Sequence, residues 1–441
     1  MTPLVFVVSD EGLGGVVPFG RAIRESGLVP VLLSGPAAPA GGPKAWAEVY
    51  EQVEVLDDPY QPQVLTERVA RIAGGKPVAG LFSCYDGLIL PAARAAAAYG
   101  LPHPGLNGLE QARNKYASRL ATRRRGIATP RFHLITAAQE CSEAARAVGF
   151  PAVLKPLNGM ASHLVRRVDD AGELAEAYRE AVARIALSFG GHYAQPVRLP
   201  GNGGTLDPST SLLLEQFLAG SEYSAEVIVR RGEVERVALF HKFLVDAEGF
   251  LERGFTRPSL GHEDREEAIW RYIESCLAAL EVDDTAAHVE IIDGPEGPCL
   301  VEVNAGRAGG QILVLAVREA TGIDLIAEIL ALQLGRDRPA PAPPKLRGRV
   351  TTFTLFPSTS GRIEQIRGLD RLERLPGVLQ VVPFCHRGDV IDVTDKEIFA
   401  VNFLVHGVED QELAALYAEA RRAVGFEIVP ADAMTERRST V

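Results

Sequence analysis

The sequence has few of the residues that build disulfide frameworks or zinc sites. Its five cysteines are an odd number in 441 residues, lie far apart and include no C-x-x-C pair. They are Cys84, Cys141, Cys276, Cys299 and Cys385. Cysteines dispersed in this way indicate reduced thiols in a reducing compartment. We therefore expect a cytoplasmic protein without disulfide bonds or a zinc site.

Long hydrophobic runs are also missing. A membrane-spanning helix needs about 18 or more consecutive apolar residues, and the best candidate, Leu88–Leu101, is interrupted by Pro91 and Arg94. The N-terminal stretch lacks a basic region and reaches Asp10 and Glu11 before any long apolar segment. This pattern is not that of a secretory signal peptide, and we expect no membrane partner.

An excess of positive charge is absent as well. The chain has 46 Lys and Arg against 57 Asp and Glu, for a net charge of −11. Nucleic-acid binding requires clustered Lys and Arg, so we expect no nucleic-acid partner. An anionic ligand would have to be held by a local group of cations. Apolar residues at 46% and charged residues at 23% are typical of soluble globular proteins, and the length favours two to four domains.

The first 113 residues alternate between short apolar runs and amphipathic segments. Strands are expected at Leu4–Val8, Leu28–Leu33, Val53–Leu56 and Val78–Ser83, and helices at Val17–Ser26 and Val64–Ala73. Strands that alternate with helices at this spacing predict a parallel sheet with helices on its faces. Residues 1–113 are therefore predicted to form an open α/β domain.

A glycine cluster follows the first predicted strand. Gly12 and Gly14 begin a G-x-G-x-x-G dinucleotide pattern, but Val17 stands where the third glycine is required. A tight turn between strand and helix explains the glycines without a ligand. A nicotinamide-dependent oxidoreductase therefore stays an alternative with little support.

The rest of the chain is punctuated by two segments without periodicity. Gly190–Ser211 is rich in Gly, Pro, Ser and Thr and is expected to be a long loop, and Arg338–Lys345 alternates proline and is expected to be a linker. Beyond the linker we predict a separate α+β unit over residues 346–441, of which the last ten are polar and expected to fray. Its elements are expected at Arg349–Phe356, Val378–Pro383, Ile398–Val405 and Gln411–Val424.

Three oxygen donors lie on two consecutive predicted strands. Glu290 belongs to the strand Ala287–Ile292, and Glu302 and Asn304 belong to the strand Cys299–Asn304. Residues two apart on a strand share a face, so in a hairpin Glu290 can lie opposite the other two. Two carboxylates and an amide oxygen are suitable ligands for Mg²⁺, although carboxylates on a solvated sheet face would give the same pattern.

Cations occur near both ends of the same region. Arg307 follows the second strand in the segment NAGRAGGQI, where a guanidinium could hold a phosphoryl group. Lys155 ends an apolar strand and needs an anionic partner, either a phosphate or a structural carboxylate. The loop after it carries Ser162, but no Walker motif occurs in the chain.

A further apolar strand ends in the segment Glu215–Leu218. Backbone groups of Glu215, Gln216, Phe217 and Leu218 could bind the edge of an adenine, and Glu222 on the next strand could accept ribose hydroxyls. By propensity alone the segment is a hairpin and nothing more.

The order and spacing of these residues, together with Lys115 in RNKYASRLATRRRGIATP, resemble the ATP-grasp superfamily of carboxylate–amine ligases. The resemblance covers roughly residues 75–330. It implies an ATP-grasp core of two α+β subdomains, at residues 114–220 and 221–338. It also implies that Lys115 and Lys155 hold the phosphates of ATP, that Ser162 lies in a closing loop, and that Glu215–Leu218 and Glu222 bind the nucleoside. Glu290, Glu302 and Asn304 would bind one or two Mg²⁺ ions, with Mn²⁺ as an alternative.

Two departures from the family pattern are visible. The closing loop has fewer glycines than usual, and VEVNAGRAGG has one extra residue between Asn304 and Arg307. The resemblance assigns Arg307 to the catalytic role of holding the acyl phosphate, with Arg253 or Arg257 as the alternatives if the extra residue turns Arg307 away.

The C-terminal segment is similar to that of L-amino-acid ligases, in VTTFTLFPSTSGRIEQIRGLDRLERLPGVLQVV followed by RGDVI. This resemblance implies an ATP- and Mg²⁺-dependent ligase that joins two amino acids through an acyl phosphate and releases ADP and phosphate. The alternatives are an ATP-grasp ligase or carboxylase for another metabolite, and a nucleotide-binding module without activity. The partners would be small-molecule carboxylate and amine substrates, and a homodimer is left open.

Overall fold

The computed structural model describes most of the chain. The described residues are 1–10, 15–36, 44–159, 162–185, 193, 195–199, 203–245, 252–258, 263–336, 348–393 and 399–430. The predicted linker Arg338–Lys345 and the last ten residues lie outside them, as do Gly12 and Gly14 of the glycine cluster. Among the described residues, no helix is long and apolar enough to cross a membrane.

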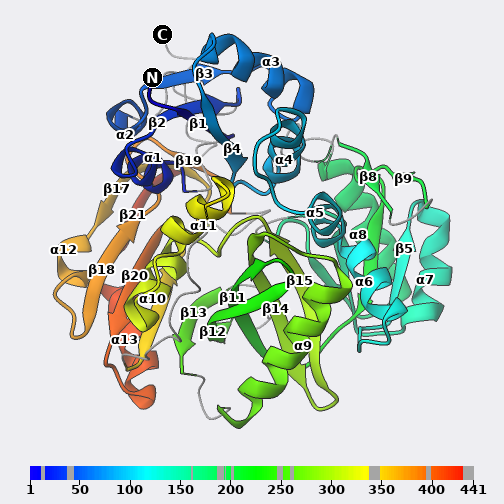
Figure 1. Cartoon of the computed structure of the whole chain (residues 1–441). Helices are drawn as coiled ribbons and strands as arrows, with labels where there is room; N and C mark the ends of the chain where they lie inside the picture. Colours follow the sequence, from blue (N-terminus) through cyan, green and yellow to red (C-terminus); the bar gives the residue numbers. More distant parts are fainter. Residues whose placement is uncertain are drawn as a thin grey trace, which may run out of the picture.

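The N-terminal domain is a parallel sheet with the strand order β3-β2-β1-β4. Every residue of β1 is buried, as expected for a parallel strand that has helices over both faces. The fold class predicted for this part of the chain is confirmed (Figure 1). Its elements are β1 (Leu4–Ser9), α1 (Val16–Glu25), β2 (Val29–Ser34), α2 (Lys44–Val49), β3 (Gln52–Val55), α3 (Pro62–Ala73), β4 (Val78–Ser83) and α4 (Ile89–Ala98).

A second, four-stranded sheet with the order β5-β10-β6-β7 carries two helices. The described part of the predicted loop Gly190–Ser211 includes the small strand pair β8–β9. The elements of this region are α5 (Leu106–Arg113), α6 (Lys115–Arg124), β5 (Phe132–Ile135), η1 (Ala138–Glu140), α7 (Cys141–Val148), β6 (Ala152–Pro156), β7 (Arg166–Val168), α8 (Ala171–Ile185), β8 (Val197–Arg198), β9 (Thr205–Leu206) and β10 (Leu212–Gln216).

The largest sheet has eight strands in the order β15-β14-β11-β12-β13-β16-β20-β18. One face of its first part packs against α9, through Ile269, Ile273 and Leu277 among others. The elements of this region are β11 (Ser221–Arg230), β12 (Glu233–Val245), β13 (Glu252–Arg257), η2 (Glu263–Arg265), α9 (Glu266–Ala279), β14 (Thr285–Gly294), β15 (Gly297–Ala305), α10 (Gln311–Thr321) and α11 (Leu325–Gln333).

Strand β13 falls in the segment 244–260, whose sequence has no clear periodicity and predicts a loop, and this prediction is wrong for residues 252–257. The strand is short and contains Gly254, whose added Cβ would crowd Phe243 and Phe353. Its hydrogen-bonded pairing with both β12 and β16 stabilises the strand, although its sequence pattern alone does not predict one.

The C-terminal segment continues this same sheet through β16, β20 and β18 and adds the small sheet β19-β17-β21. The segment predicted to be separate is thus joined to the preceding sheet by hydrogen-bonded strands (Figure 1). A domain boundary near residue 346 stays a prediction. Its elements are β16 (Val350–Leu355), β17 (Gly361–Arg367), α12 (Leu369–Leu372), β18 (Val378–Pro383), β19 (Val390–Ile391), β20 (Val401–His406), α13 (Asp410–Ala423) and β21 (Gly425–Pro430).

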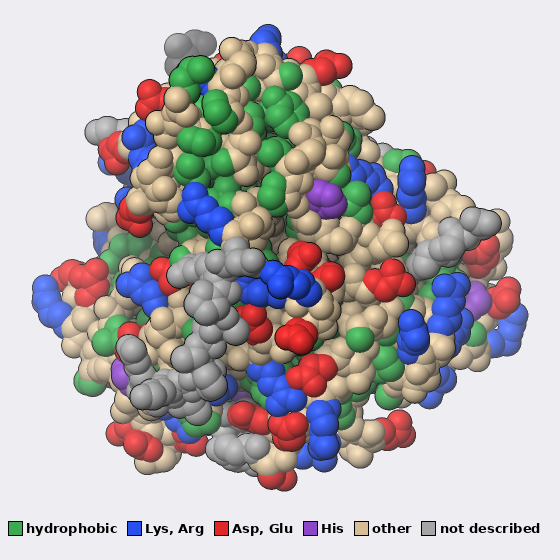
Figure 2. All heavy atoms as spheres, in the orientation of Figure 1, with side chains coloured by type: hydrophobic (Ala, Val, Ile, Leu, Met, Phe, Trp, Pro, Cys, Tyr) green, Lys and Arg blue, Asp and Glu red, His purple; other side chains and the backbone are tan. Residues whose placement is uncertain are grey.

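The surface drawn in Figure 2 mixes charges of both signs. Acidic and basic side chains are interspersed over the lower part of this face, and hydrophobic side chains are more frequent over the N-terminal domain at the top. The described residues of this face form no broad basic patch.

The C-terminal core is centred on Phe353, which is fully buried. Its ring stacks on Phe403 at 5.0 Å and on Tyr417 at 5.4 Å between centroids. Because removal of a buried phenylalanine leaves a cavity, we expect Phe353→Ala to lower the free energy of unfolding by about 3–5 kcal/mol. Leu379→Ala, at a side chain that is 52% exposed, should change it by less than about 0.5 kcal/mol. Urea denaturation measures both, and equal effects would contradict this account of the core.

Candidate active site

A cavity of about 1860 Å³ lies where the three parts of the chain meet. One wall is the face of the eight-stranded sheet that is turned away from α9. On β11 the alternation of side chains sends Tyr223 and Ala225 into the core under α9, and therefore sends Glu222 and Glu226 to the opposite face. The same alternation on β14 and β15 brings charged side chains to one surface.

The predicted metal ligands lie side by side on this surface. Glu290 and Glu302 are paired directly across β14 and β15, and Asn304 donates from Nδ2 to Glu302 Oε1 at 2.8 Å. Both carboxylates line the cavity, whereas Asn304 does not. Carboxylate oxygens with one nearby amide are hard donors that fit Mg²⁺. No group of three or more His, Cys, Asp or Glu side chains among the described residues could hold a metal ion.

Lysine side chains compensate these carboxylates. The Nζ of Lys242, whose side chain is 0% exposed, lies 2.7 Å from Glu222 and 3.1 Å from Glu290, and Lys115 Nζ lies 2.7 Å from Glu302 Oε2. Burial alone would raise the pKa of Glu290, but Lys242 and His288 outweigh it and hold that pKa below its usual range. The pKa of Glu222 is raised, because burial and the neighbouring carboxylates outweigh Lys242.

A second acid–base pair fixes the loop that carries Arg307. Glu226 accepts from His288 Nδ1 at 2.7 Å and from the backbone N–H of Gly309 at 3.1 Å. Burial lowers the pKa of His288, but Glu226 and Glu290 outweigh it and raise the pKa to about 9. A Cβ at Gly309 would collide with Glu226, so only glycine permits this close approach.

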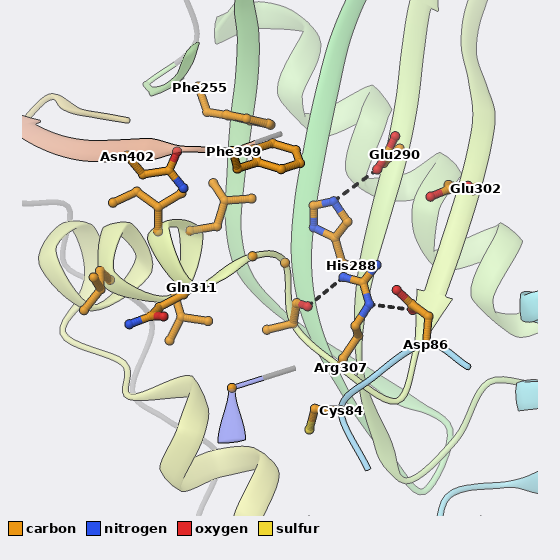
Figure 3. Close-up of a pocket in the computed structure, with 18 of the residues that line it drawn as sticks. Cys84, Asp86, Phe255, His288, Glu290, Glu302, Arg307, Gln311, Phe399 and Asn402 are labelled. Carbon is orange, nitrogen blue, oxygen red and sulfur yellow. Dashed lines mark hydrogen bonds and ion pairs between the residues drawn. The ribbon is translucent and has the colours of Figure 1, made fainter. Parts of the chain in front are cut away.

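The guanidinium of Arg307 reaches the cavity. Its Nε donates to Asp86 Oδ1 at 2.6 Å, and Nη1 donates to the carbonyl of Ala308 at 2.9 Å (Figure 3). Asp86 outweighs the effect of burial and raises the pKa of Arg307 further. Neither of the two alternative arginines lines the cavity. Arg257 is buried and donates to the carbonyl of Leu239.

The predicted nucleotide side of the cavity centres on a buried carboxylate. Glu215 accepts from Arg119 Nε at 2.7 Å and is also paired with Lys155. Burial by itself would raise the pKa of Glu215, and the two cations outweigh it and lower that pKa. Arg119 also donates to the carbonyl of Val301 at 2.8 Å, so it links α6 to both sheets. Lys115 donates to the carbonyl of Gly159 at 2.9 Å.

Gln216, Phe217 and Leu218, which follow Glu215, all line the cavity. The backbone N–H of Gln216 donates to the carbonyl of Arg131, and that of Phe217 donates to the carbonyl of Pro151. These two amides are therefore already engaged within the protein.

The structure brings the residues selected from the sequence together. Eleven of the twelve line the cavity, namely Lys115, Lys155, Ser162, Glu215, Gln216, Phe217, Leu218, Glu222, Glu290, Glu302 and Arg307, and Asn304 lies next to them. Their roles toward a ligand stay predictions.

Sequence reasoning missed five charged or titratable residues here: Asp86, Arg119, Glu226, Lys242 and His288. The alternation of side chains along each strand could have identified Glu226 and His288. Glu226 follows Ser224 by two positions on β11, and His288 precedes Glu290 by two positions on β14, so each pair shares a face. Asp86 and Arg119 could not be found in this way, because tertiary packing alone brings Asp86 to the cavity and Arg119 to Glu215.

Comparisons with known proteins identify the two main parts of the chain. The model of the ATP-grasp domain matches residues 148–314, and that of L-amino acid ligase C-terminal domain 2 matches residues 353–429. The chain is an ATP-grasp ligase. This ligase is 28% identical over 384 residues to an uncharacterized protein, y4rH, of Sinorhizobium fredii, covering 84% of the chain and 73% of the relative. It is 22% identical to an L-arginine-specific L-amino acid ligase of Bacillus subtilis, covering 83% of each.

The fold of this ATP-grasp ligase matches that of a solved L-amino acid ligase from Bacillus licheniformis. The two superpose with a TM-score of 0.80 at 22% identity, and the match covers 96% of this chain and 99% of the other. At this identity the match shows the shared fold, including the C-terminal strands that extend the large sheet.

Arg119 of the ligase gives a test of the buried charge cluster. Arg119→Gln breaks a buried ion pair and leaves Glu215 with Lys155 as its remaining cation, so it should lower the free energy of unfolding by about 3–5 kcal/mol. Arg166→Gln, which breaks the exposed pair with Glu180, should cost no more than about 1 kcal/mol. Adding Glu215→Gln to Arg119→Gln should recover none of the loss, because it leaves the buried ammonium of Lys155 without its carboxylate. Urea denaturation of all three variants checks this, and equal effects of the two single substitutions would contradict it.

Proposed function

We propose that this ligase uses ATP and Mg²⁺ to join a carboxylate to an amine through an acyl phosphate, with amino acids as substrates and a dipeptide or related amide as product. The observation that carries the proposal is the facing pair Glu290 and Glu302 in a cavity that also contains Lys115, Lys155 and Arg307. Metal-binding carboxylates and phosphate-binding cations in one cavity support phosphoryl transfer.

The chemistry requires activation because a carboxylate oxygen is a poor leaving group at neutral pH. The substrate carboxylate attacks the γ-phosphorus of ATP, the bond to ADP breaks, and an acyl phosphate forms. The amine then attacks the acyl carbon, the bond to phosphate breaks, and the nitrogen loses a proton. The products are an amide, ADP and phosphate, so atoms and charge balance without an oxidant or a covalent enzyme intermediate.

The cations would position the nucleotide. Lys155 and Lys115 now hold Glu215 and Glu302, and each would turn to the phosphates when ATP enters. Glu290, Glu302 and Asn304 would hold Mg²⁺, which supplies neutralisation of the phosphate charge. Gln216, Phe217 and Leu218 would border the adenine, and Ser162 would close over the phosphates. Glu222 pairs with Lys242, and we propose that it reaches the ribose.

Arg307 would hold the transferred phosphoryl group and the tetrahedral state that follows. Asp86 fixes its Nε, so the planar fork enters the cavity in one orientation. A guanidinium held in advance stabilises developing charge without reorganisation. This role is what distinguishes a ligase from a module that only binds nucleotide.

The match to an L-amino acid ligase C-terminal domain favours amino acids over other carboxylates. A ligase or carboxylase for a different metabolite is the second candidate, since the same cavity face could serve it. Small-molecule partners follow from either proposal. The cytoplasmic location and the homodimer stay predictions from the sequence.

Replacement of a metal ligand tests the proposal. Glu302→Gln keeps the volume and removes the charge, so ADP release with a panel of amino acids should fall by at least about 100-fold, on the scale of losing a central electrostatic contact. Glu180→Gln on the exposed face of α8 is the matched control and should leave the rate unchanged. Near-normal turnover of Glu302→Gln at saturating Mg²⁺ would refute the assignment.

Arg307 is tested by the separation of kcat from KM. Arg307→Lys keeps the charge but loses the fork that Asp86 orients, so kcat should fall sharply while the KM for ATP changes only a few-fold. Steady-state kinetics with saturating amino acids measures both constants. A large rise in the KM for ATP at unchanged kcat would instead place Arg307 among the nucleotide-binding residues.

A further inference from the structure

The cavity extends beyond the charged residues into the C-terminal domain. Lys242 on β12 pairs with Phe255 on β13, and Phe255 pairs with Thr352 on β16. Thr354 lies two residues further along β16 and pairs with Asn402 on β20. Cα partners in register and residues two apart share one face. The face that presents the metal ligands therefore runs without interruption to Asn402.

Asn402 is a buried amide without a bonding partner for its oxygen. Its side chain lines the cavity and the residue is only 3% exposed, yet Oδ1 accepts no hydrogen bond. Burial of an amide oxygen without a donor costs free energy. A bound molecule that supplies a hydrogen-bond donor would remove this cost.

The walls around Asn402 combine apolar with neutral polar side chains, and Lys242 Nζ lies 5.7 Å from the ring centre of Phe255. In Figure 3, Phe255, Phe399 and Asn402 lie on the opposite side of the cavity from Glu290 and Glu302, and Gln311 of α10 is drawn below them. Among the described residues, those that the C-terminal domain contributes to the lining include no Asp, Glu, Lys or Arg. They are Thr354, Gln380, Pro383, Phe384, Cys385, His386, Phe399 and Asn402.

We propose that Phe255, Thr354, Phe399 and Asn402 form a side-chain subsite for one of the two amino-acid substrates. The subsite selects a side chain with an apolar or aromatic body and a neutral hydrogen-bond donor at its end, such as a phenol, an indole or a carboxamide. The apolar body packs between the two phenylalanine rings, and the donor binds Asn402 Oδ1. This inference rests on the proposed function and names the class of substrate that it leaves open.

The charge distribution gives the reason for a neutral donor. An ammonium or guanidinium would need a carboxylate in this part of the cavity, and the C-terminal lining residues supply none among the described part of the chain. A carboxylate side chain would add no donor to the unpaired oxygen. A hydroxyl, ring N–H or amide satisfies Oδ1 without carrying charge into an apolar site.

The test compares substrates that differ only by the donor. ADP release is measured with tyrosine against phenylalanine and with glutamine against methionine, each with a common second amino acid that the panel shows to be active. The wild-type chain should favour the donor-bearing member in kcat/KM by about tenfold, the size of one neutral hydrogen bond in a desolvated site. Asn402→Leu should reduce that ratio to about one and leave the KM for ATP unchanged.

Two further variants keep the test decisive. Asn402→Asp retains the volume and introduces a carboxylate, so it should raise kcat/KM for lysine relative to tyrosine by at least about tenfold. Asn107→Leu makes the same change as Asn402→Leu at an exposed residue of α5 that lies outside the cavity lining, and it should keep the wild-type ratios.

The outcomes separate the two levels of inference. Amino-acid-dependent ADP release with the same substrate ratios in wild type, Asn402→Leu and Asn402→Asp would overturn the subsite and leave the proposed function intact. Absence of ADP release with every amino acid in the panel would overturn the proposed function and the subsite with it.

Discussion

The rest of the structure depends on the neutralisation of acidic side chains that one sheet face brings together. The alternation of strands β11, β14 and β15 places Glu222, Glu290 and Glu302 in a partly desolvated cavity, with Glu226 buried next to it against His288. Carboxylates in such a position repel each other and lose hydration. The fold supplies a counter-charge for each, and Lys242 serves both Glu222 and Glu290.

The counter-charges come from different parts of the chain. Lys242 belongs to the same sheet, Lys115 begins α6, and His288 approaches Glu226 from the neighbouring strand. In the opposite sense, Asp86 from the N-terminal domain compensates Arg307. The pairs Lys115–Glu302 and Asp86–Arg307 therefore join the large sheet to other parts of the chain at the cavity. This explains why no single sequence segment contains a complete phosphate-binding motif.

These ion pairs also mark the limit of what the sequence could predict. The parallel N-terminal sheet and the hairpin of Glu290 and Glu302 follow from local periodicity, which a sequence displays directly. Lys155 was identified because an ammonium at the end of an apolar strand demands a partner, although the sequence did not show that Glu215 is that partner. Asp86 and Arg119 have no local signature. Strand β13 was missed because its stability comes from β12 and β16, which flank it in space and are distant along the chain.

The unbroken sheet from β15 to β18 has a consequence for how such a protein can diversify. The part of this surface that carries Glu290 and Glu302 belongs to residues 221–305, and the far end of the same surface belongs to residues 350–406. Substitutions in the second segment can change what the far end accepts while the register of β13 with β16 keeps both ends aligned. Mutations that alter selectivity and mutations that alter catalysis can thus accumulate in different segments of the chain. The hydrogen bonds between β13 and β16 exclude only insertions that would shift the register of these two strands.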